Sequence, residues 1–125
     1  MKKKVLLVDD SNTVLLMEKM ILAKRPYDIV TARDGAEGVA KAKSERPDVI
    51  LLDVMMPNLD GLSACAALRA DPDTAHIPIV MVTTRGEQDN IETAFRNGAN
   101  DYITKPINGL ELLTKLEHIL GENAA

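Results

Sequence analysis

Short apolar segments alternate along this chain with longer segments of helical period. The apolar segments are residues 5–8, 27–31, 49–52, 79–82 and 102–104. Four of them are dense in valine, isoleucine and leucine without polar alternation. That composition is typical of strands buried on both faces of a parallel sheet. We therefore predict five strands, most of them in the interior.

The segments between the strands have apolar residues at the spacing of amphipathic helices. The predicted helices are residues 12–24, 35–45, 62–70, 88–97 and 108–120. Gly98 and Gly121 follow the last two helices, where glycine commonly ends a helix. Five strand–helix units in one short chain predict an α/β fold, an open parallel sheet with helices on both faces.

Composition narrows the class of protein. The chain has 125 residues, so we expect a single domain over 1–125 with a fraying tail at 122–125. A net charge of −4 and three aromatic residues argue against direct nucleic-acid binding and against binding to an anionic membrane. The lone cysteine, Cys65, excludes an internal disulfide, and no apolar segment reaches membrane-spanning length. We expect a soluble, cytoplasmic protein.

Polar residues follow four of the five predicted strands. They are Asp9 and Asp10, Asp53, Thr83 and Thr84, and Lys105. The carboxyl ends of parallel strands meet at one edge of a sheet, where ligands bind. Each residue has an ordinary interpretation by itself: Asp10 or Ser11 could cap a helix, and Lys105 could be a solvated loop residue. Because they fall at the same edge of the sheet, together they favour a ligand-binding site.

The charges of this cluster indicate a bound cation. Two carboxylates about 4 Å apart repel by roughly 4 kcal/mol at an effective dielectric of about 20. Lys105 offsets only part of this repulsion. Carboxylate oxygens and water are the ligands that Mg²⁺ prefers, with Mn²⁺ as an alternative. The cluster contains no serine–histidine pair, whereas phosphoryl transfer to a carboxylate needs only positioning and charge neutralisation.

These residues lie in segments that resemble the receiver domain of two-component response regulators, the CheY-like family. The matching segments are residues 5–10, 47–57, 60–61, 78–83 and 98–106, in order and at family spacing. The resemblance covers essentially the whole chain. It implies a doubly wound, flavodoxin-like fold with five parallel strands in the order 2-1-3-4-5 and five helices.

The resemblance also implies a role for each matching residue. Asp53 would accept the phosphoryl group. Asp9, Asp10 and Asp53 would bind Mg²⁺ together with the backbone carbonyl of Met55, Asp9 acting through water. Lys105 would pair with the phosphoryl group, and the peptide bond between it and Pro106 would be cis.

Three further positions follow from the resemblance. Thr83 would donate a hydrogen bond to the phosphoryl group, assisted by backbone N–H groups near Val54 and Thr84. Tyr102 would change rotamer with phosphorylation. Thr84 is larger than the residue that is usual there.

Met55 and Arg85 stand where the family tunes dephosphorylation. Met55 could screen the acyl phosphate from water, and Arg85 could reach a phosphoryl oxygen. The ordinary interpretations are gap-filling for Met55 and a solvated charge for Arg85.

The implied function is a signalling switch and not an enzyme. A sensor histidine kinase or a phosphotransfer protein would phosphorylate Asp53. The face formed by the fourth helix, fifth strand and fifth helix would then bind a downstream protein or a fused output domain. The chain could be a stand-alone regulator or the N-terminal receiver of a longer protein, and a monomer or a weak phosphorylation-dependent dimer.

Three rival functions remain. A haloacid-dehalogenase-type phosphatase needs an acid two positions after its aspartate nucleophile, where this chain has Met55 or Ser11. A flavodoxin-like cofactor binder needs a Gly/Ser/Thr-rich loop after the first strand, where Asp9 and Asp10 would repel phosphate. A protein-binding domain that works without phosphorylation is the third.

Overall fold

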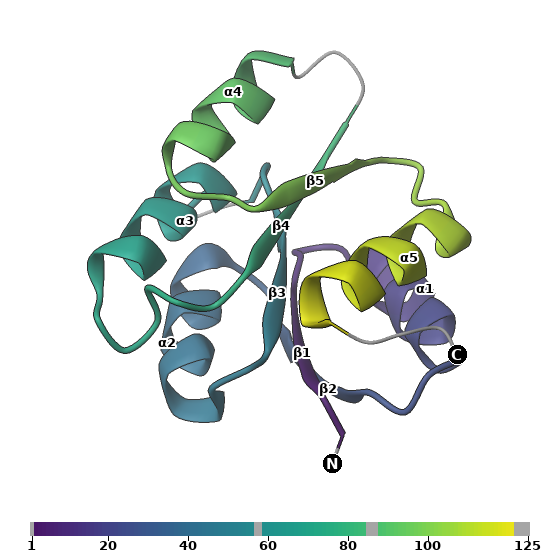
Figure 1. Ribbon diagram of the computed structural model, residues 1–125. Coiled ribbons are helices and arrows are strands. Elements are labelled where there is room, and N and C mark those ends of the chain that lie inside the picture. The colour runs from purple at the N-terminus through teal and green to yellow at the C-terminus, as the bar shows by residue number, and fades with distance from the viewer. Residues whose placement is uncertain (1, 57–58, 85–87, 122–125) are drawn as a thin grey trace.

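Strands and helices alternate throughout the molecule (Figure 1). The computed structural model describes residues 2–56, 59–84 and 88–121, so Arg85 and the expected fraying tail lie outside the described residues. The elements are β1 (Lys4–Val8), α1 (Asn12–Leu22), β2 (Asp28–Ala32), α2 (Gly35–Glu45), β3 (Val49–Asp53), α3 (Gly61–Ala70), β4 (Ile79–Thr83), α4 (Gln88–Arg96), β5 (Asp101–Thr104) and α5 (Gly109–Leu120).

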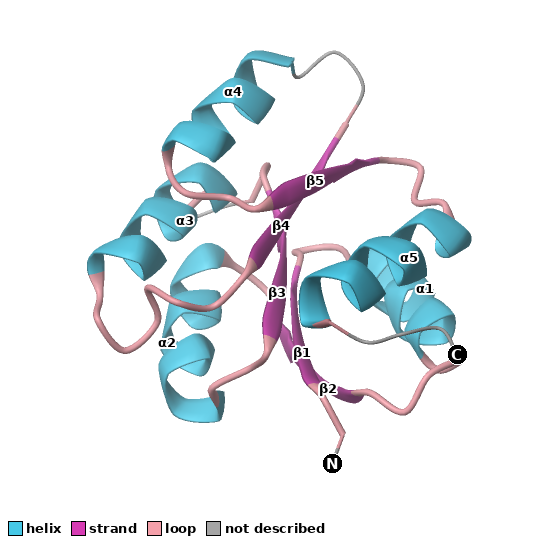
Figure 2. Ribbon diagram, viewed as in Figure 1, coloured by secondary structure: helices cyan, strands magenta, loops and turns pink. Residues whose placement is uncertain are grey.

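The five strands form one parallel sheet in the order β2-β1-β3-β4-β5, which confirms the predicted order. Helices α1 and α5 cover one face of the sheet, and α2, α3 and α4 cover the other (Figure 2). The chain reverses its direction of winding between β1 and β3. In such sheets the carboxyl ends of these two strands are where a ligand binds.

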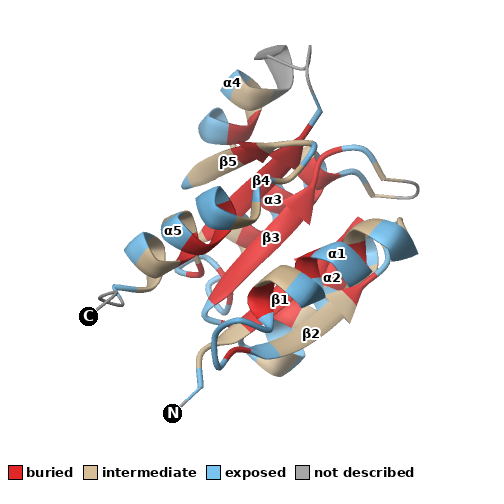
Figure 3. Cartoon of the chain, turned by 90° about the vertical axis from the view of Figure 1, so that its right-hand side faces the viewer, coloured by how far each residue is buried: buried red, intermediate tan, exposed pale blue. Residues whose placement is uncertain are grey.

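The sheet is buried on both faces because successive side chains of each strand point to opposite sides. In β1, Leu6 and Val8 belong to the core beneath α2, α3 and α4, whereas Val5 and Leu7 belong to the core beneath α1 and α5. Strand β3 is buried over its whole length (Figure 3). This two-sided burial explains why the strand segments lack polar alternation.

Element boundaries differ from the prediction by one or two residues. Strand β2 begins at Asp28, which pairs in register with Lys4, whereas Tyr27 packs into the core beneath α1 and α5. Helix α1 ends at Leu22 and not at residue 24, and residues 23–26 continue as turns. Gly121 caps α5 with a left-handed φ of 71°, as predicted.

Two features of the fold bear on earlier expectations. Cys65 is buried, as predicted. No helix of the described residues combines the length and the apolar character needed to cross a membrane.

Candidate functional site

Three carboxylates meet at the carboxyl ends of β1 and β3. These strands are neighbours, with Val8 opposite Leu52, so the residues that follow each strand lie side by side. One carboxylate oxygen from each of Asp9, Asp10 and Asp53 lies within 4.8 Å of the other two. Asp9 and Asp53 are buried, at 1% and 4% exposure, and Asp10 is exposed. The structure thus brings together the acids that the sequence places after separate strands.

Asp9 is held in place by the start of α1. Its Oδ1 accepts a hydrogen bond of 2.9 Å from the backbone N–H of Ser11. Ser11 is the N-cap of α1, and its hydroxyl accepts from the N–H of Val14. Of the two capping candidates in the sequence, Ser11 is therefore the cap. Asp10 is left with its carboxylate at the site.

Lys105 supplies the positive charge of the site. Its Nζ lies 3.3 Å from Oδ1 of Asp53 and 3.4 Å from Oδ2 of Asp9. Its backbone N–H donates to the carbonyl of Thr83 at 2.6 Å, which ties the loop after β5 to the end of β4. The peptide bond between Lys105 and Pro106 is cis, as the family resemblance implied.

Burial and crowding of negative charge alter the acid–base properties of the site. Burial, followed by the charge of Asp9, raises the pKa of Asp53 to about 6, although Lys105 opposes the shift. Burial alone would lower the pKa of Lys105, but Asp53 and Asp9 outweigh it and leave that pKa raised. One ammonium therefore does not balance the carboxylates around it.

The donor set fits a hard divalent cation. Oδ2 of Asp9 is buried and accepts no hydrogen bond from any described residue, although it lies 3.4 Å from the Lys105 ammonium. The oxygens that could bind an ion come from Asp9, Asp10 and Asp53. Carboxylate oxygens are the ligands that Mg²⁺ takes in proteins, usually with several waters. Met55, whose carbonyl is a further predicted ligand, lies two residues after Asp53 with its side chain 63% exposed.

Thr83 lies beside Asp53 at the end of β4. The register pairs Asp53 with Val82, so Thr83 follows immediately on the neighbouring strand. Thr83 is 1% exposed, and its Oγ1 has no hydrogen-bond partner among the described residues. A buried hydroxyl without a partner is costly, and it can donate to an oxygen that arrives next to Asp53.

One backbone N–H next to Asp53 is engaged within the sheet. The N–H of Val54 already donates to the carbonyl of Val82 at 3.1 Å. That group extends the sheet and is engaged before any ligand arrives. Thr84, the other position expected to contribute a backbone donor, is exposed.

The start of α3 approaches the end of β3 closely. The N–H of Gly61 donates to the carbonyl of Val54 at 2.9 Å. A Cβ at Gly61 would collide with the backbone carbonyl of Asp53. Because glycine has no side chain, α3 can begin directly against the end of β3 and fix the position of Asp53.

Glu18 is a buried acid that the sequence analysis did not identify. It is 1% exposed on α1, between Leu15 and Leu22 on the inward stripe of the helix. Its Oε1 has no hydrogen-bond partner within the described part of the chain. Burial, followed by the charge of Asp9, raises its pKa to about 8. The sequence did indicate this burial, because Glu18 lies three residues after Leu15 and four before Leu22, on the apolar side of a predicted helix.

Another predicted position, Tyr102, lies on the strand next to β4. Tyr102 is half-buried on β5, and its ring packs edge-on against Phe95 of α4, with centroids 6.1 Å apart.

Comparison with known proteins identifies one family. Residues 5–117 match the family model for the response regulator receiver domain. The chain is 39% identical over 120 residues to the alkaline phosphatase synthesis transcriptional regulatory protein PhoP of Bacillus subtilis, covering 96% of this chain and 49% of PhoP. It is 38% identical over 117 residues to protein PilH of Pseudomonas aeruginosa, covering 94% of this chain and 97% of PilH. The chain thus spans about half of PhoP and nearly all of PilH.

Solved structures of receiver domains and chemotaxis proteins have the same fold as this chain. The chemotaxis protein CheY4 of Vibrio cholerae superposes with a TM-score of 0.88 at 35% identity, covering 95% of this chain and 99% of that one. The receiver domain of sensor histidine kinase PA1611 from Pseudomonas aeruginosa superposes with a TM-score of 0.89 at 31% identity, covering 98% of this chain and 100% of that one. That structure has a magnesium ion coordinated in its active-site cleft.

Proposed function

Because the chain belongs to the response regulator receiver domain family, we propose that it accepts a phosphoryl group on Asp53 from the phosphohistidine of a sensor histidine kinase or a phosphotransfer protein. A receiver domain is a signalling switch of two-component systems and not an enzyme in the usual sense. The observation that carries the proposal is the position of the Lys105 ammonium, 3.3 Å from Asp53 and 3.4 Å from Asp9.

The proposed reaction forms one bond and breaks one bond. A carboxylate oxygen of Asp53 attacks phosphorus, the P–N bond of the donor breaks, and its electron pair stays on the departing imidazole. The product is an acyl phosphate. A pKa of about 6 keeps most of Asp53 ionised, and therefore nucleophilic, at neutral pH.

The residues around Asp53 stabilise the charge that moves in this reaction. Lys105 pairs with a phosphoryl oxygen, and the Thr83 hydroxyl donates to another. Asp9, Asp10, Asp53 and the Met55 carbonyl would hold Mg²⁺, or Mn²⁺ in its place, with Asp9 binding through water. Such an ion would supply positive charge next to the phosphoryl oxygens.

Phosphorylation is proposed to alter the face formed by α4, β5 and α5 through Thr83, Thr84 and Tyr102. A hydrogen bond to a charged group contributes about 1.5–3 kcal/mol, whereas a full two-state switch requires about 5.5 kcal/mol. Thr83 therefore does not drive the switch alone. Either Lys105 and backbone donors contribute too, or the active state is already appreciably populated before phosphorylation, and we expect the second to contribute. The altered face then binds a downstream protein, a fused output domain or a second copy of the chain.

Intact-mass spectrometry after incubation with acetyl phosphate tests the proposal. The wild type should gain one phosphoryl group with Mg²⁺ and none with excess EDTA. Asp53→Asn should gain none. Asp48→Asn is the matched control: this residue precedes β3 at its other end, where its carboxylate binds the N–H of Lys4, and the variant should behave as wild type.

A wild type that gains nothing from acetyl phosphate, phosphoramidate or a co-expressed sensor kinase would overturn the proposal. The chain would then be a protein-binding domain that works without phosphorylation.

A further inference from the structure

Lys115 makes three contacts with one short segment of β5. Its Nζ lies 3.0 Å from Oδ1 of Asp101 and donates to the backbone carbonyl of Tyr102 at 2.7 Å. The same nitrogen lies 5.1 Å from the centroid of the Tyr102 ring. An ammonium has three N–H donors, so two can serve the oxygens while the third faces the ring. Lys115 thus binds the backbone and the side chain of Tyr102 together.

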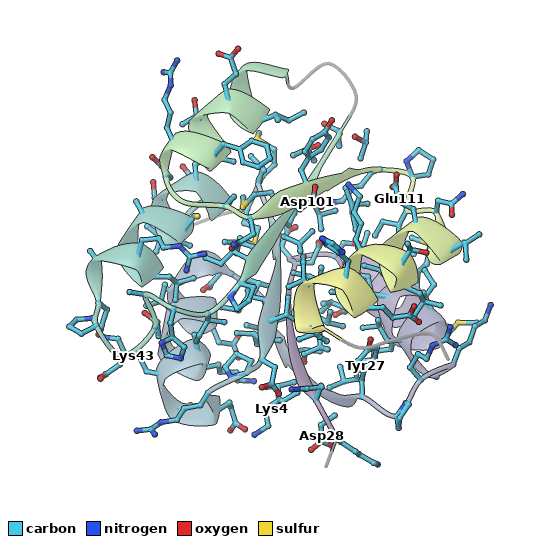
Figure 4. All side chains as sticks on the ribbon, viewed as in Figure 1. Lys4, Tyr27, Asp28, Lys43, Asp101 and Glu111 are labelled. Carbon is cyan, nitrogen blue, oxygen red and sulfur yellow. The ribbon has the colours of Figure 1, made fainter. Side chains whose placement is uncertain are left out.

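Asp101 fixes the position of this ammonium. Its Oδ1 also accepts a hydrogen bond of 2.8 Å from the backbone N–H of Tyr102. The carboxylate is therefore held on β5, where it lies beside α5 (Figure 4). Both side chains of the ion pair are partly covered, at 26% exposure for Lys115 and 33% for Asp101. Lys115 is therefore anchored by groups that do not depend on where the Tyr102 ring lies.

The Tyr102 ring lies between elements on two sides. β5 is an edge strand of the sheet, and side chains of both α4 and α5 contact the ring. Phe95 of α4 packs against it edge-on, at an interplanar angle of 87°, and Lys115 of α5 lies over it. A cation within about 6 Å of a ring centroid is attracted to the ring face. If the ring rotates away, this attraction is lost while the contacts of Lys115 with Asp101 and with the Tyr102 carbonyl can remain.

We propose that Lys115 is a positioning residue that sets the resting orientation of the Tyr102 ring. The ammonium discriminates between ring orientations because only one of them places the ring beneath it, and a group shifts an equilibrium only through such a difference. This proposal rests on the proposed function in one respect, namely that Tyr102 responds to phosphorylation of Asp53. Replacing Lys115 should therefore populate the second ring orientation before any phosphoryl group is present.

The χ1 populations of Tyr102 test the proposal directly. They are obtained by NMR from the three-bond couplings of the Tyr102 Cγ to its own backbone nitrogen and carbonyl carbon. The chain has only two tyrosines, and Tyr27, buried beneath α1 and α5, serves as an internal reference for intact folding. The unphosphorylated wild type is compared with Lys115→Met, Lys115→Arg and Lys19→Met. The last variant removes an equal charge from an exposed position on α1.

We expect Lys115→Met to change the ratio of Tyr102 rotamers by at least about twofold, whereas Lys115→Arg and Lys19→Met keep the wild-type ratio. Unchanged couplings in Lys115→Met would overturn the proposal, as would an equal change in Lys115→Arg. A second arm adds acetyl phosphate and Mg²⁺ to the wild type. If mass spectrometry shows phosphorylation and the Tyr102 couplings do not move, the role of Tyr102 in the proposed function is wrong, whereas the result on the unphosphorylated protein stands.

Discussion

The ammonium of Lys105 lies 3.3 Å from Oδ1 of Asp53, although β4 separates their strands in the sheet. The lysine reaches the acid because the loop after β5 is bonded to the carbonyl of Thr83 at the end of β4. The positive charge of Lys105 offsets part of the repulsion among the three carboxylates. It does not cancel the effects of burial and of Asp9, so the pKa of Asp53 stays raised.

Removing the charge of Lys105 should raise the pKa of Asp53 further. We expect Lys105→Met to move it from about 6 to about 7 or higher, because an opposite charge at this distance favours the ionised form by about one unit or more. NMR titration of the Asp53 carboxyl carbon measures this value. The control is Lys43→Met, which removes an equal charge from α2 (Figure 4). Lys43 there forms an ion pair with Asp71. An Asp53 pKa that is the same in both variants would contradict the assignment.

Glu18 should make the protein less stable as the pH rises. Below pH 4.5 the acid is protonated in both the folded and the unfolded state and has no effect. Between pH 4.5 and about 8 the unfolded state releases the proton while the folded state keeps it, so stability is lost across this window. We expect Glu18→Gln to remove this loss, a gain on the order of a few kcal/mol at pH 8.

Urea denaturation at several pH values measures this effect of Glu18. Glu92→Gln is the control, since Glu92 has a side chain 75% exposed on α4. A stability difference between Glu18→Gln and wild type that stays constant from pH 5 to pH 8 would exclude a buried, protonated Glu18.

Two glycines provide a matched test of how β3 is positioned. Gly61 and Gly109 are each the first residue of a helix, after the N-caps Asp60 and Asn108. A Cβ at Gly61 would collide with the backbone carbonyl of Asp53, whereas at Gly109 it would make ordinary contact with Ile21. We expect Gly61→Ala to cost about 2 kcal/mol or more and to slow phosphorylation.

By contrast, Gly109→Ala should leave stability within about 1 kcal/mol of wild type. Thermal unfolding and the rate of phosphorylation by acetyl phosphate check both variants. Equal effects of the two substitutions would show that α3 does not press against Asp53.

Met55 and Arg85 are predicted to lengthen the lifetime of the phosphoryl group. Met55 follows Asp53 closely, and its exposed, apolar side chain can screen the acyl phosphate from water. The double variant Met55→Asn with Arg85→Glu should lose its phosphoryl group severalfold faster than wild type. The decay is followed by intact mass after removal of the donor, with Met55→Leu as an apolar control that keeps the wild-type rate. An unchanged rate of phosphoryl loss in the double variant would contradict this prediction.

The residues of the candidate site could be predicted from the sequence more completely than the residues packed around it. The strand segments and the residues after them placed Asp9, Asp53 and Lys105 together, because parallel strands all deliver their carboxyl ends to one edge. Glu18 was missed because its burial depends on which stripe of α1 faces the sheet, and a charged residue at core spacing is normally assigned to the surface.

Lys115 shows the second limit of sequence reasoning. Its partners Asp101 and Tyr102 lie 14 and 13 positions earlier in the chain, on another element. Their contact depends on how α5 packs across the edge strand, which periodicity does not determine. The end of α2 was predicted correctly, but its cap is Arg46 with a left-handed φ of 49°, a conformation in which glycine is the residue expected.

The central claim is that Asp53 carries the phosphoryl group. The most direct measurement treats the protein with acetyl phosphate and Mg²⁺, reduces the acyl phosphate with borohydride, and maps the resulting homoserine by peptide mass spectrometry. Homoserine at position 53 alone, absent when EDTA replaces Mg²⁺, is the predicted result. Homoserine at Asp9 or Asp10, or an equal yield at Asp53 without the metal, would contradict the account.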